Sequence, residues 1–244
     1  MAAELKLGTG QAPDQKREAA IAAKNFDVET QIKQRFGSKD AALKVLAKPV
    51  RTKLQTLFAA HNLVYPPSRL TLIALKEEKK LMVYVPDQAG KQTLVLTYPI
   101  IGASGGSGPK LKEGDKQVPE GFYTINGFRT DVIAYMALKV DYPNAEDRRH
   151  AREEKRKNLG GDILVHGSRW STGCLAMGNP AIEELFVLAA DSGEGKTRLI
   201  LSPCNLLQHR PALNYKKQPS WLPDLYERLT AELKQFPGLA QTKN

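Results

Sequence analysis

The spacing of apolar residues changes near residue 67 and separates a helical stretch from a strand-rich one. Two groups of apolar residues before that point recur every three or four positions, as on one face of a helix: Val28, Ile32 and Phe36, and then Val50, Leu54, Leu57 and Phe58. Ser38 predicts the start of a helix, and the run Tyr65-Pro66-Pro67 predicts its end. We therefore expect a helical N-terminal extension over residues 1–66.

From Leu70 onwards, apolar residues come in short runs or alternate with polar residues, a pattern typical of β-strands. The pattern predicts strands over 70–75, 81–85, 93–98, 122–128, 134–140, 163–166 and 198–201. The charged residues 76–80 between the first two strands predict a hairpin. The strand-rich domain is expected to extend over residues 67–204, and the predicted fold class is mostly β (α+β).

Two helices are expected after the strand that ends at His166. Asn179 predicts an N-cap, with Pro180 in the first turn, for a helix that would pack beneath the preceding loop. An amphipathic helix over 220–236 belongs to a helical C-terminal extension, residues 205–244. The N-terminal helices either form a separate substrate-binding module or brace the domain. We favour the brace, because their apolar faces need a surface to cover.

Composition narrows the class of protein and its partners. No apolar run approaches the roughly 18 residues that a membrane-spanning helix needs, so no transmembrane segment is expected. The first residues after Met1 lack the apolar stretch of a secretory signal. The net charge of +10 favours an anionic partner. The densest basic cluster, residues 148–157, is interrupted by acids and lacks stacking aromatics, so a nucleic acid is not the expected partner.

Candidate chemistry is concentrated between His166 and Cys174. His166 ends an apolar run, and Cys174 follows Ser171, Thr172 and Gly173 in a predicted tight loop. A base at a strand end beside a thiol in a loop suits nucleophilic cysteine chemistry, because the imidazole takes the thiol proton. The N–H groups of Gly173 and Cys174 are candidates to bind a developing oxyanion. From these residues alone, a buried structural role for both side chains is equally open.

Neither a metal site nor a disulfide is expected. The chain has 4 His and 2 Cys, without the C-x-x-C or H-x-x-x-H spacing typical of zinc sites, and no metal or cofactor is predicted. Cys204 follows Pro203 at the end of the strand-rich domain and is interpreted as structural or incidental. We expect Cys204 to lie too far from Cys174 to pair with it, because a disulfide needs Cα atoms within about 7 Å.

Three segments resemble elements of one known family, the L,D-transpeptidase (YkuD-like) catalytic domains. Residues 166–174 resemble its active-site signature, which reads H-G, a spacer, and S-x-G-C. Residues 108–123, with Gly108-Pro109-Lys110 ahead of Gly114-Asp115, are similar to its G-D-x-x-x-P-x-G-x-Y element. Residues 141–145 are similar to its F/Y-P-N-A element. The three stand in the family's order between about Leu70 and Pro203, which makes the resemblance specific.

The resemblance implies a β-sandwich catalytic domain and a ping-pong acyl transfer on peptidoglycan stem peptides at meso-diaminopimelate. Cys174 is then the nucleophile, and His166 is the base and later the acid. The backbone carbonyl of Gly167 or Ser168 would orient the imidazole. The candidate substrate contacts are Arg169, Trp170, Ser171, Thr172 and Tyr123. Ser171 and Thr172 are interpreted mainly as residues that shape the loop. The alternative role of Tyr123 is to pack its strand.

Two departures from the family pattern favour one branch of it. The spacer between His166 and Cys174 is short, and Ala176-Met177 stands where the family usually has an Arg two residues after the Cys. Both resemble the murein L,D-endopeptidases, which release lipoprotein bound to the cell wall, so we expect hydrolysis. A cross-linking or protein-attaching transpeptidase, and a peptidoglycan-binding protein without turnover, are the alternatives. The resemblance also implies a periplasmic or cell-envelope location and a signal that was removed.

Overall fold

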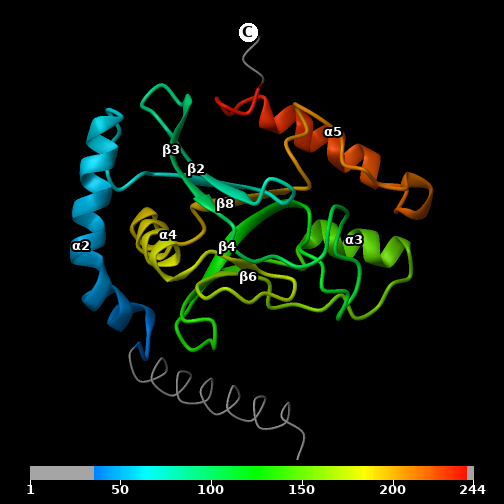
Figure 1. The fold of residues 1–244 in the computed structure, drawn as a ribbon, viewed down its shortest axis with the longest axis horizontal. Coiled ribbons are helices and arrows are strands. Elements are labelled where there is room, and N and C mark those ends of the chain that lie inside the picture. The colour runs from blue at the N-terminus through cyan, green and yellow to red at the C-terminus, as the bar shows by residue number, and fades with distance from the viewer. Residues whose placement is uncertain (1–35, 241–244) are drawn as a thin grey trace, which may run out of the picture.

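A single curled sheet of eight strands forms the centre of the computed structural model, which describes residues 36–240 (Figure 1). The strands are β1 (Leu70–Leu75), β2 (Lys80–Pro86), β3 (Gln92–Pro99), β4 (Gly121–Arg129), β5 (Ala137–Val140), β6 (Leu164–His166), β7 (Leu175–Ala176) and β8 (Thr197–Ser202). Their order across the sheet is β3-β2-β1-β8-β4-β5-β6-β7. Strands β1 and β8 pair in parallel, as do β6 and β7, and the other neighbours are antiparallel. The expected α+β class is confirmed.

Strand β1 is apolar along almost its whole length because both faces of the sheet are covered there. Leu72 and Ala74 belong to a core cluster on one face, and Ile73 and Leu75 belong to a second cluster on the other. Successive side chains of a strand point to opposite faces, so a strand covered on both sides loses the apolar–polar alternation. The short apolar run therefore marks the strand buried deepest in the molecule.

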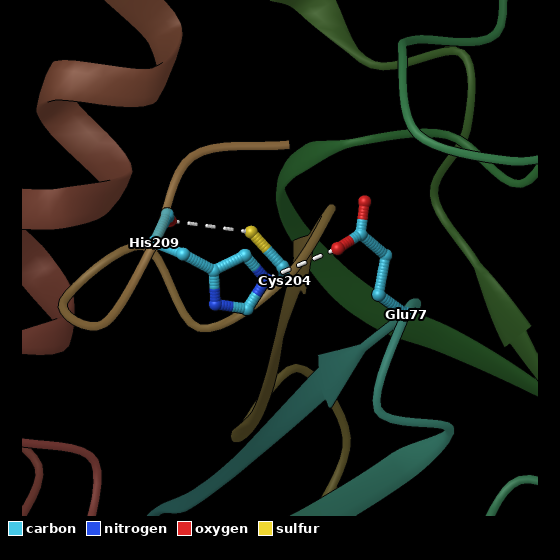
Figure 2. Close-up of side chains that lie close together, drawn as sticks. All are labelled: Glu77, Cys204 and His209. Carbon is cyan, nitrogen blue, oxygen red and sulfur yellow. Dashed lines mark hydrogen bonds and ion pairs between the residues drawn. The ribbon is translucent and has the colours of Figure 1, made fainter. Parts of the chain in front are cut away.

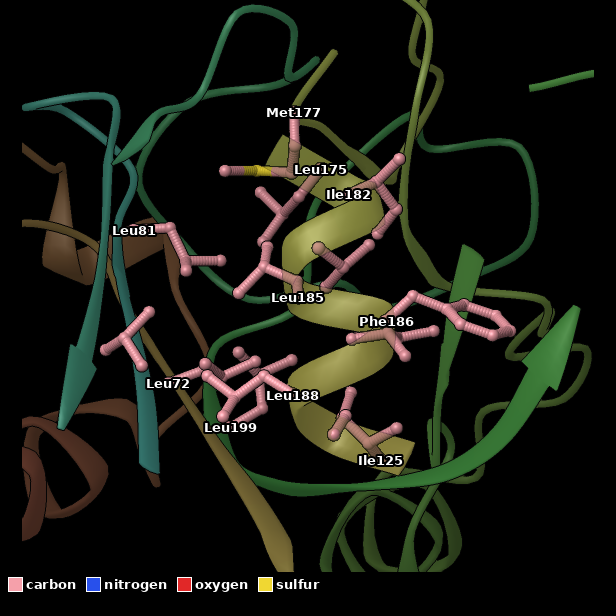
Figure 3. Packing of buried hydrophobic residues seen from close by; sticks show 14 of the residues in the cluster. Leu72, Leu81, Ile125, Leu175, Met177, Ile182, Leu185, Phe186, Leu188 and Leu199 are labelled. Carbon is pink, nitrogen blue, oxygen red and sulfur yellow. The ribbon is translucent and has the colours of Figure 1, made fainter. Parts of the chain in front are cut away.

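Helix α4 (Asn179–Ser192) lies inside the curl of the sheet (Figure 3). Its side chains Ile182, Leu185 and Phe186 are fully buried and share one core cluster with residues of β1, β2, β4 and β8. Two residues, Met177 and Gly178, separate the end of β7 from the start of this helix. Packing of α4 in the core therefore fixes the position of the loop that precedes β7.

Helix α2 (Lys39–Ala60) packs along α4 on the side away from the sheet. Leu54 and Phe58 are fully buried in the same cluster as α4. The Arg51 guanidinium donates two hydrogen bonds, of 2.6 and 2.8 Å, to the carboxylate of Asp191 near the end of α4. The helix begins after Ser38, whose side chain accepts a hydrogen bond from the first turn, as the sequence predicts. The earlier apolar positions Val28 and Ile32 lie outside the described residues.

Helix α5 (Leu222–Leu233) covers the opposite face of the sheet from α4. Its apolar stripe, Leu222, Leu225, Leu229 and Leu233, is buried against side chains of β1, β2 and β8. Helix α3 (Ala145–Glu153) follows β5, and a 3₁₀ turn, η1 (Tyr215–Lys217), precedes α5. None of the described helices is long and apolar enough to cross a bilayer.

The structure departs from the sequence-based expectations at several places, and helix α2 already ends at Ala60, before the run Tyr65-Pro66-Pro67. The strand expected over 134–140 begins only at Ala137, because Tyr135 adopts a positive φ of 81° in a turn that a strand cannot contain. Strand β7 was not expected, since two residues carry no periodicity. Asn179 is the first residue of α4 rather than its N-cap, which is Gly178, and its side chain bonds a neighbouring loop instead.

Candidate active site

His166 is the last residue of β6, and Cys174 directly precedes β7, the strand paired with β6. Strands β6 and β7 run in parallel, with His166 opposite Ala176. Cys174 is the residue directly before β7, in a bend. Since paired strands lie about 4.8 Å apart, His166 and Cys174 stand on neighbouring segments of the chain.

The His166 imidazole is buried, with 3% of its surface exposed, and is held in one tautomer. Its Nδ1 lies 2.5 Å from the carbonyl oxygen of Gly167. A carbonyl only accepts hydrogen bonds, so Nδ1 carries the proton and Nε2 keeps its lone pair. Burial lowers the pKa of His166, and the Gly167 carbonyl opposes this shift. The imidazole is therefore neutral at pH 7 and has a free basic nitrogen.

The Cys174 thiol is half-buried and protonated in this structure. Burial raises the pKa of Cys174, a backbone hydrogen bond from Leu164 lowers it, the Asp162 carboxylate raises it and the Lys110 ammonium lowers it. The thiol donates a hydrogen bond of 3.6 Å to the carbonyl oxygen of Asp162. The directions of both pKa shifts therefore favour a neutral thiol and a neutral imidazole over a thiolate and an imidazolium.

Ser171 closes the turn that presents the thiol. Its hydroxyl donates to the Cys174 carbonyl oxygen, at 2.5 Å, and accepts from the Cys174 N–H, at 3.0 Å. Gly173 between them has a φ of +91°, which L side chains rarely adopt. The Gly173 N–H donates to the hydroxyl of Ser104 from another loop, at 2.6 Å. Both candidate oxyanion donors are therefore occupied by serine hydroxyls.

The residues directly after His166 are held in place by backbone hydrogen bonds and by the side chain of Asn179. Gly167 donates its N–H to the Met136 carbonyl, and a Cβ at Gly167 would lie 2.8 Å from the Asn179 side chain. That Asn179 side chain accepts the Ser168 N–H at 2.9 Å. The Ser168 carbonyl accepts from Gly178, which leaves Gly167 as the carbonyl that orients the imidazole. Helix α4 thus positions the base as well as the thiol.

Lys110 is a buried cation close enough to the thiol to lower its pKa. Its ammonium donates to the Asp115 carboxylate, at 2.6 Å, and to the Lys112 carbonyl, at 2.8 Å. Asp115 also accepts backbone N–H groups of Leu111, Lys112 and Gln117. Burial alone would raise the pKa of Asp115, but Lys110 and these N–H groups together lower it below its ordinary value. The segment around Asp115 is therefore folded around the ammonium group of Lys110 and holds it in place.

The exposed part of the loop lines a groove of about 460 Å³ on one side of the site. Arg169 and Thr172 are exposed, and Trp170 has 88% of its surface exposed. Arg169 and Trp170 line the groove together with Ile101, itself an exposed apolar residue. A large aromatic ring left in water next to a site is available for contact with a ligand. This placement suits Arg169 and Trp170 as substrate contacts.

A larger hollow of about 610 Å³ lies near the loop. Gln117 lines it, and a Cβ at Gly173 would lie 3.4 Å from the Gln117 carbonyl oxygen. Four cationic side chains line the same hollow: Lys112, Arg156, Lys157 and Lys217. The single carboxylate in its lining, Asp115, is paired with Lys110. The hollow therefore presents positive charge beside the thiol-bearing loop.

Tyr123 does not reach the site. Its ring is buried, with 4% exposed, and its hydroxyl bonds the Asp147 carboxylate at 3.1 Å and the Glu120 carbonyl at 3.3 Å. The structure therefore places Tyr123 in the packing role that was its alternative. Cys174 and Cys204 are both free thiols.

Sequence reasoning did not single out Ser104, Asp162 or the role of Lys110. Lys110 stands inside a segment that carried the family resemblance, so that motif could have pointed to Lys110 as a residue of the site. Ser104 and Asp162 act on the loop from 69 and 12 residues away along the chain, and only folding brings them there.

Comparison with known proteins agrees with the resemblance. The sequence profile of the L,D-transpeptidase catalytic domain, YkuD, matches residues 70–198, more than half of the chain. Over 114 residues the chain is 41% identical to the Escherichia coli (strain K12) protein named "Putative L,D-transpeptidase YafK". That alignment covers 46% of this chain and 43% of the relative, so the chain matches less than half of that protein's length.

Two solved structures are similar to this chain at lower identity. The helical cell shape determining protein Pgp2 from Campylobacter jejuni is 24% identical, over 55% of this chain and 47% of that chain, with a TM-score of 0.45. Bdellovibrio bacteriovorus Bd1075 is 19% identical, over 70% of this chain and 56% of that chain, with a TM-score of 0.43.

Proposed function

Because the chain belongs to the YkuD family of L,D-transpeptidase catalytic domains, we propose that it is a cysteine-dependent acyl-transfer enzyme that cleaves peptidoglycan stem peptides at meso-diaminopimelate. The observation that carries this proposal is the state of His166. Its Nδ1–H is bonded to the Gly167 carbonyl, which leaves the lone pair on Nε2, and His166 ends the strand that pairs with the strand directly after Cys174.

The first step is attack of the thiol on the stem-peptide carbonyl. The Cys174 S–H leaves the Asp162 carbonyl and gives its proton to Nε2 of His166 as sulfur bonds the carbonyl carbon. The proton moves during attack, because both groups are neutral before it. The new imidazolium is stabilised by the Gly167 carbonyl at Nδ1. Collapse of the tetrahedral intermediate breaks the C–N bond, and the imidazolium protonates the departing amine.

Gly173 is the stronger oxyanion donor of the two candidates. Its N–H is bonded to Ser104, which belongs to a separate loop and can be displaced by a substrate oxygen. The Cys174 N–H is bonded within its own turn by Ser171, and losing that bond would open the turn. We therefore assign Gly173 as the main donor and Ser171 as the residue that shapes the loop.

Hydrolysis of the resulting thioester by water completes the cleavage. The short spacer before Cys174 and the absence of the family's usual Arg after it favour this outcome over transfer to an amine. The cationic hollow beside Gln117 suits the carboxylates of a stem peptide, because Coulomb attraction holds an anion near Lys112 and Lys217. The proposed location is the periplasm or cell envelope, and a wall-linked lipoprotein is the proposed released partner.

Product analysis on purified peptidoglycan tests the proposal directly. The full chain is incubated with sacculi, with and without a wall-linked protein, and the products are identified by mass spectrometry. We expect released peptide or protein and no new cross-links. The matched variant Cys174→Ala should release nothing, a loss of at least about 10³-fold, while its thermal melting stays close to that of the wild type.

Each other outcome identifies an alternative. New cross-links or newly attached protein would replace hydrolysis by a transpeptidase reaction. Binding to sacculi without any product, equal for wild type and Cys174→Ala, would leave a peptidoglycan-binding protein. Release that persists in Cys174→Ala would remove the thiol from the mechanism.

A further inference from the structure

Three side chains of types that ligate metals lie together where the β1–β2 turn meets the segment after β8 (Figure 2). Glu77 belongs to the turn, and Cys204 and His209 belong to the segment. One ligand atom from each residue, a carboxylate oxygen, a sulfur and a ring nitrogen, lies within 4.8 Å of the other two. Because Glu77 is far from the others in the sequence, no local spacing reveals the group.

Two of the three ligand atoms belong to partly exposed side chains, and the third, the Cys204 sulfur, is buried beneath them. Nε2 of His209 lies 3.1 Å from a Glu77 carboxylate oxygen, and both side chains are partly exposed. The Cys204 thiol is buried and donates to the His209 carbonyl oxygen at 3.5 Å. An exposed His–Glu pair over a thiol is worth little as a stabilising contact, since such pairs contribute roughly 0–1 kcal/mol. Stability alone therefore does not account for this arrangement.

The charges around Cys204 favour a cation beside it. Three carboxylates, those of Glu77, Glu78 and Glu120, act on Cys204 by their charge, against one cation, Arg210. One oxygen of Glu78 accepts the Asn205 N–H at 2.8 Å. The other oxygen of Glu78 is buried and has no hydrogen-bond partner among the described residues. A buried carboxylate oxygen without a partner is costly, and a nearby cation would offset that cost.

The ligand set selects the kind of ion. One sulfur, one imidazole nitrogen and one carboxylate oxygen match Zn²⁺, whereas Mg²⁺ and Ca²⁺ prefer oxygen ligands only. Around a tetrahedral Zn²⁺ with bonds of about 2.0–2.3 Å, ligand atoms lie about 3.3–3.7 Å apart. The partly exposed side chains of Glu77 and His209 can close the remaining ångström. The second oxygen of Glu77 accepts the Ser107 hydroxyl at 2.5 Å, which orients the carboxylate.

We propose that Glu77, Cys204 and His209 bind one Zn²⁺ ion, with a water molecule as fourth ligand. Binding replaces the thiol S–H bond by a sulfur–zinc bond and releases the proton to solvent. The ion ties the β1–β2 turn to the segment after β8. Through Ser107 it also contacts the loop whose Ser104 bonds Gly173, so the metal site and the active site share one loop.

Titration of the reduced, chelator-treated full chain with Co²⁺ alone and with Zn²⁺ alone tests the proposal. The Cys174→Ser variant serves as the parent, because Cys204 is then its only thiol. We expect one Co²⁺ per chain with a thiolate-to-cobalt charge-transfer band, and one Zn²⁺ per chain by calorimetry. Because the thiol is protonated before binding, about one proton should be released per Zn²⁺ at pH 7, measured in buffers of different ionisation enthalpy.

Variants of the ligands and of a matched residue decide the assignment. Adding Cys204→Ser should abolish the charge-transfer band, and adding His209→Ala or Glu77→Gln should weaken Zn²⁺ binding at least tenfold. The control variant is His61→Ala. His61 is an exposed histidine that is not one of the proposed ligands, so its replacement should leave the affinity for Zn²⁺ unchanged. Circular dichroism confirms that each variant is folded. A parent that binds no Co²⁺ through sulfur, or binding that survives in folded Cys204→Ser or His209→Ala, would overturn the proposal.

Discussion

At the scale of single residues, the protonation states of His166 and Cys174 define how the site works. Both groups are buried enough that their charged forms are disfavoured, so the pKa of the imidazole is lowered and that of the thiol is raised. In the mechanism that we propose, the proton transfer between them is part of the attack, and the two nearby charges shift the pKa of the thiol in opposite directions, Asp162 upwards and Lys110 downwards.

Replacing His166 by Ala should slow alkylation of Cys174 at neutral pH, because the base that removes the thiol proton is gone. The measurement is the iodoacetamide rate as a function of pH in a Cys204→Ser background, so that one thiol reports. His61→Ala is the matched control and should behave as the parent. If the rate and its pH profile are unchanged in His166→Ala, the two side chains do not interact and His166 is a core residue.

Replacing Asp162 by Asn should shift the alkylation profile of Cys174 to lower pH. The Asp162 carboxylate raises the thiol pKa, while its backbone carbonyl, which accepts the thiol proton, is kept in the variant. The same alkylation series measures the effect. Asp131→Asn, which removes an exposed carboxylate that is also paired with Arg129, serves as the control for loss of a surface charge. A shift to higher pH would show that the side chain does not act on the thiol by its charge.

At the scale of elements, short capping interactions join the segments around the sheet. Asn144 caps α3, and Asp147 completes a capping box by accepting the Asn144 N–H at 2.9 Å. The Asn144 amide also donates to the Phe122 carbonyl, which ties the start of α3 to β4. The 141–145 element that carried the family resemblance is thus a strand-to-helix connection. Its residues serve the fold, and they hold Tyr123 in place through Asp147.

Asp147 gives α3 a specific pH dependence. Burial raises the pKa of Asp147 from 3.8 to about 6. Between about pH 4 and pH 6 the folded protein keeps a proton that the unfolded chain releases, so this group lowers the free energy of unfolding as pH rises through that window. At pH 7 the cost is about 2–3 kcal/mol, from a shift of about two units.

The variant Asp147→Asn cannot ionise and should lose this dependence. We expect its stability relative to the wild type to improve by about 2–3 kcal/mol between pH 4 and pH 7, measured by urea unfolding at several pH values. Asp224→Asn, an exposed carboxylate in the first turn of α5, controls for the general effect of removing a charge. A difference between Asp147→Asn and wild type that stays constant with pH would contradict the assignment.

At the scale of the whole molecule, the helices outside the sheet are parts of its two cores. Helix α2 shares a cluster with α4, and α5 covers the other face of β1 and β8. A buried ion pair connects the second face to the active-site loops. Lys76 donates to Glu120 at 3.0 Å and to the carbonyls of Gly108 and Val118, and the Tyr226 hydroxyl of α5 donates to the same Glu120 at 2.7 Å.

Truncation of Phe58 should therefore destabilise the entire domain. Phe58→Ala removes a fully buried ring between α2 and α4 and is expected to cost about 3–5 kcal/mol. Gln55→Ala, an exposed position of the same helix, should stay within about 0.5 kcal/mol of wild type. Urea unfolding followed by circular dichroism measures both. If Phe58→Ala melts only part of the helical signal and leaves the main transition in place, α2 is a separate module and not a brace.

The sequence by itself determined the local elements and the reacting pair. Apolar periodicity predicts the bounds of β1, β2, β3 and β8 within one or two residues. The burial of one or both faces of a strand sets the order of apolar and polar residues along it, and this order can be read without knowing which strands lie beside it. The signature around His166 and Cys174 places both groups at a strand end and in a tight loop, since Gly173 and Ser171 dictate local backbone geometry.

Only the tertiary structure decided the surroundings of that pair and the second group of ligands. Ser104, Lys110 and Asp162 act on the active-site loop from separate segments, and Glu77 meets Cys204 and His209 across 127 residues or more. Tyr123, predicted from its motif as a substrate contact, is enclosed by packing that no local pattern specifies. Burial and nearby charge depend on long-range contacts, and these set the pKa of the thiol and the imidazole, so the chemistry of the site is a property of the fold.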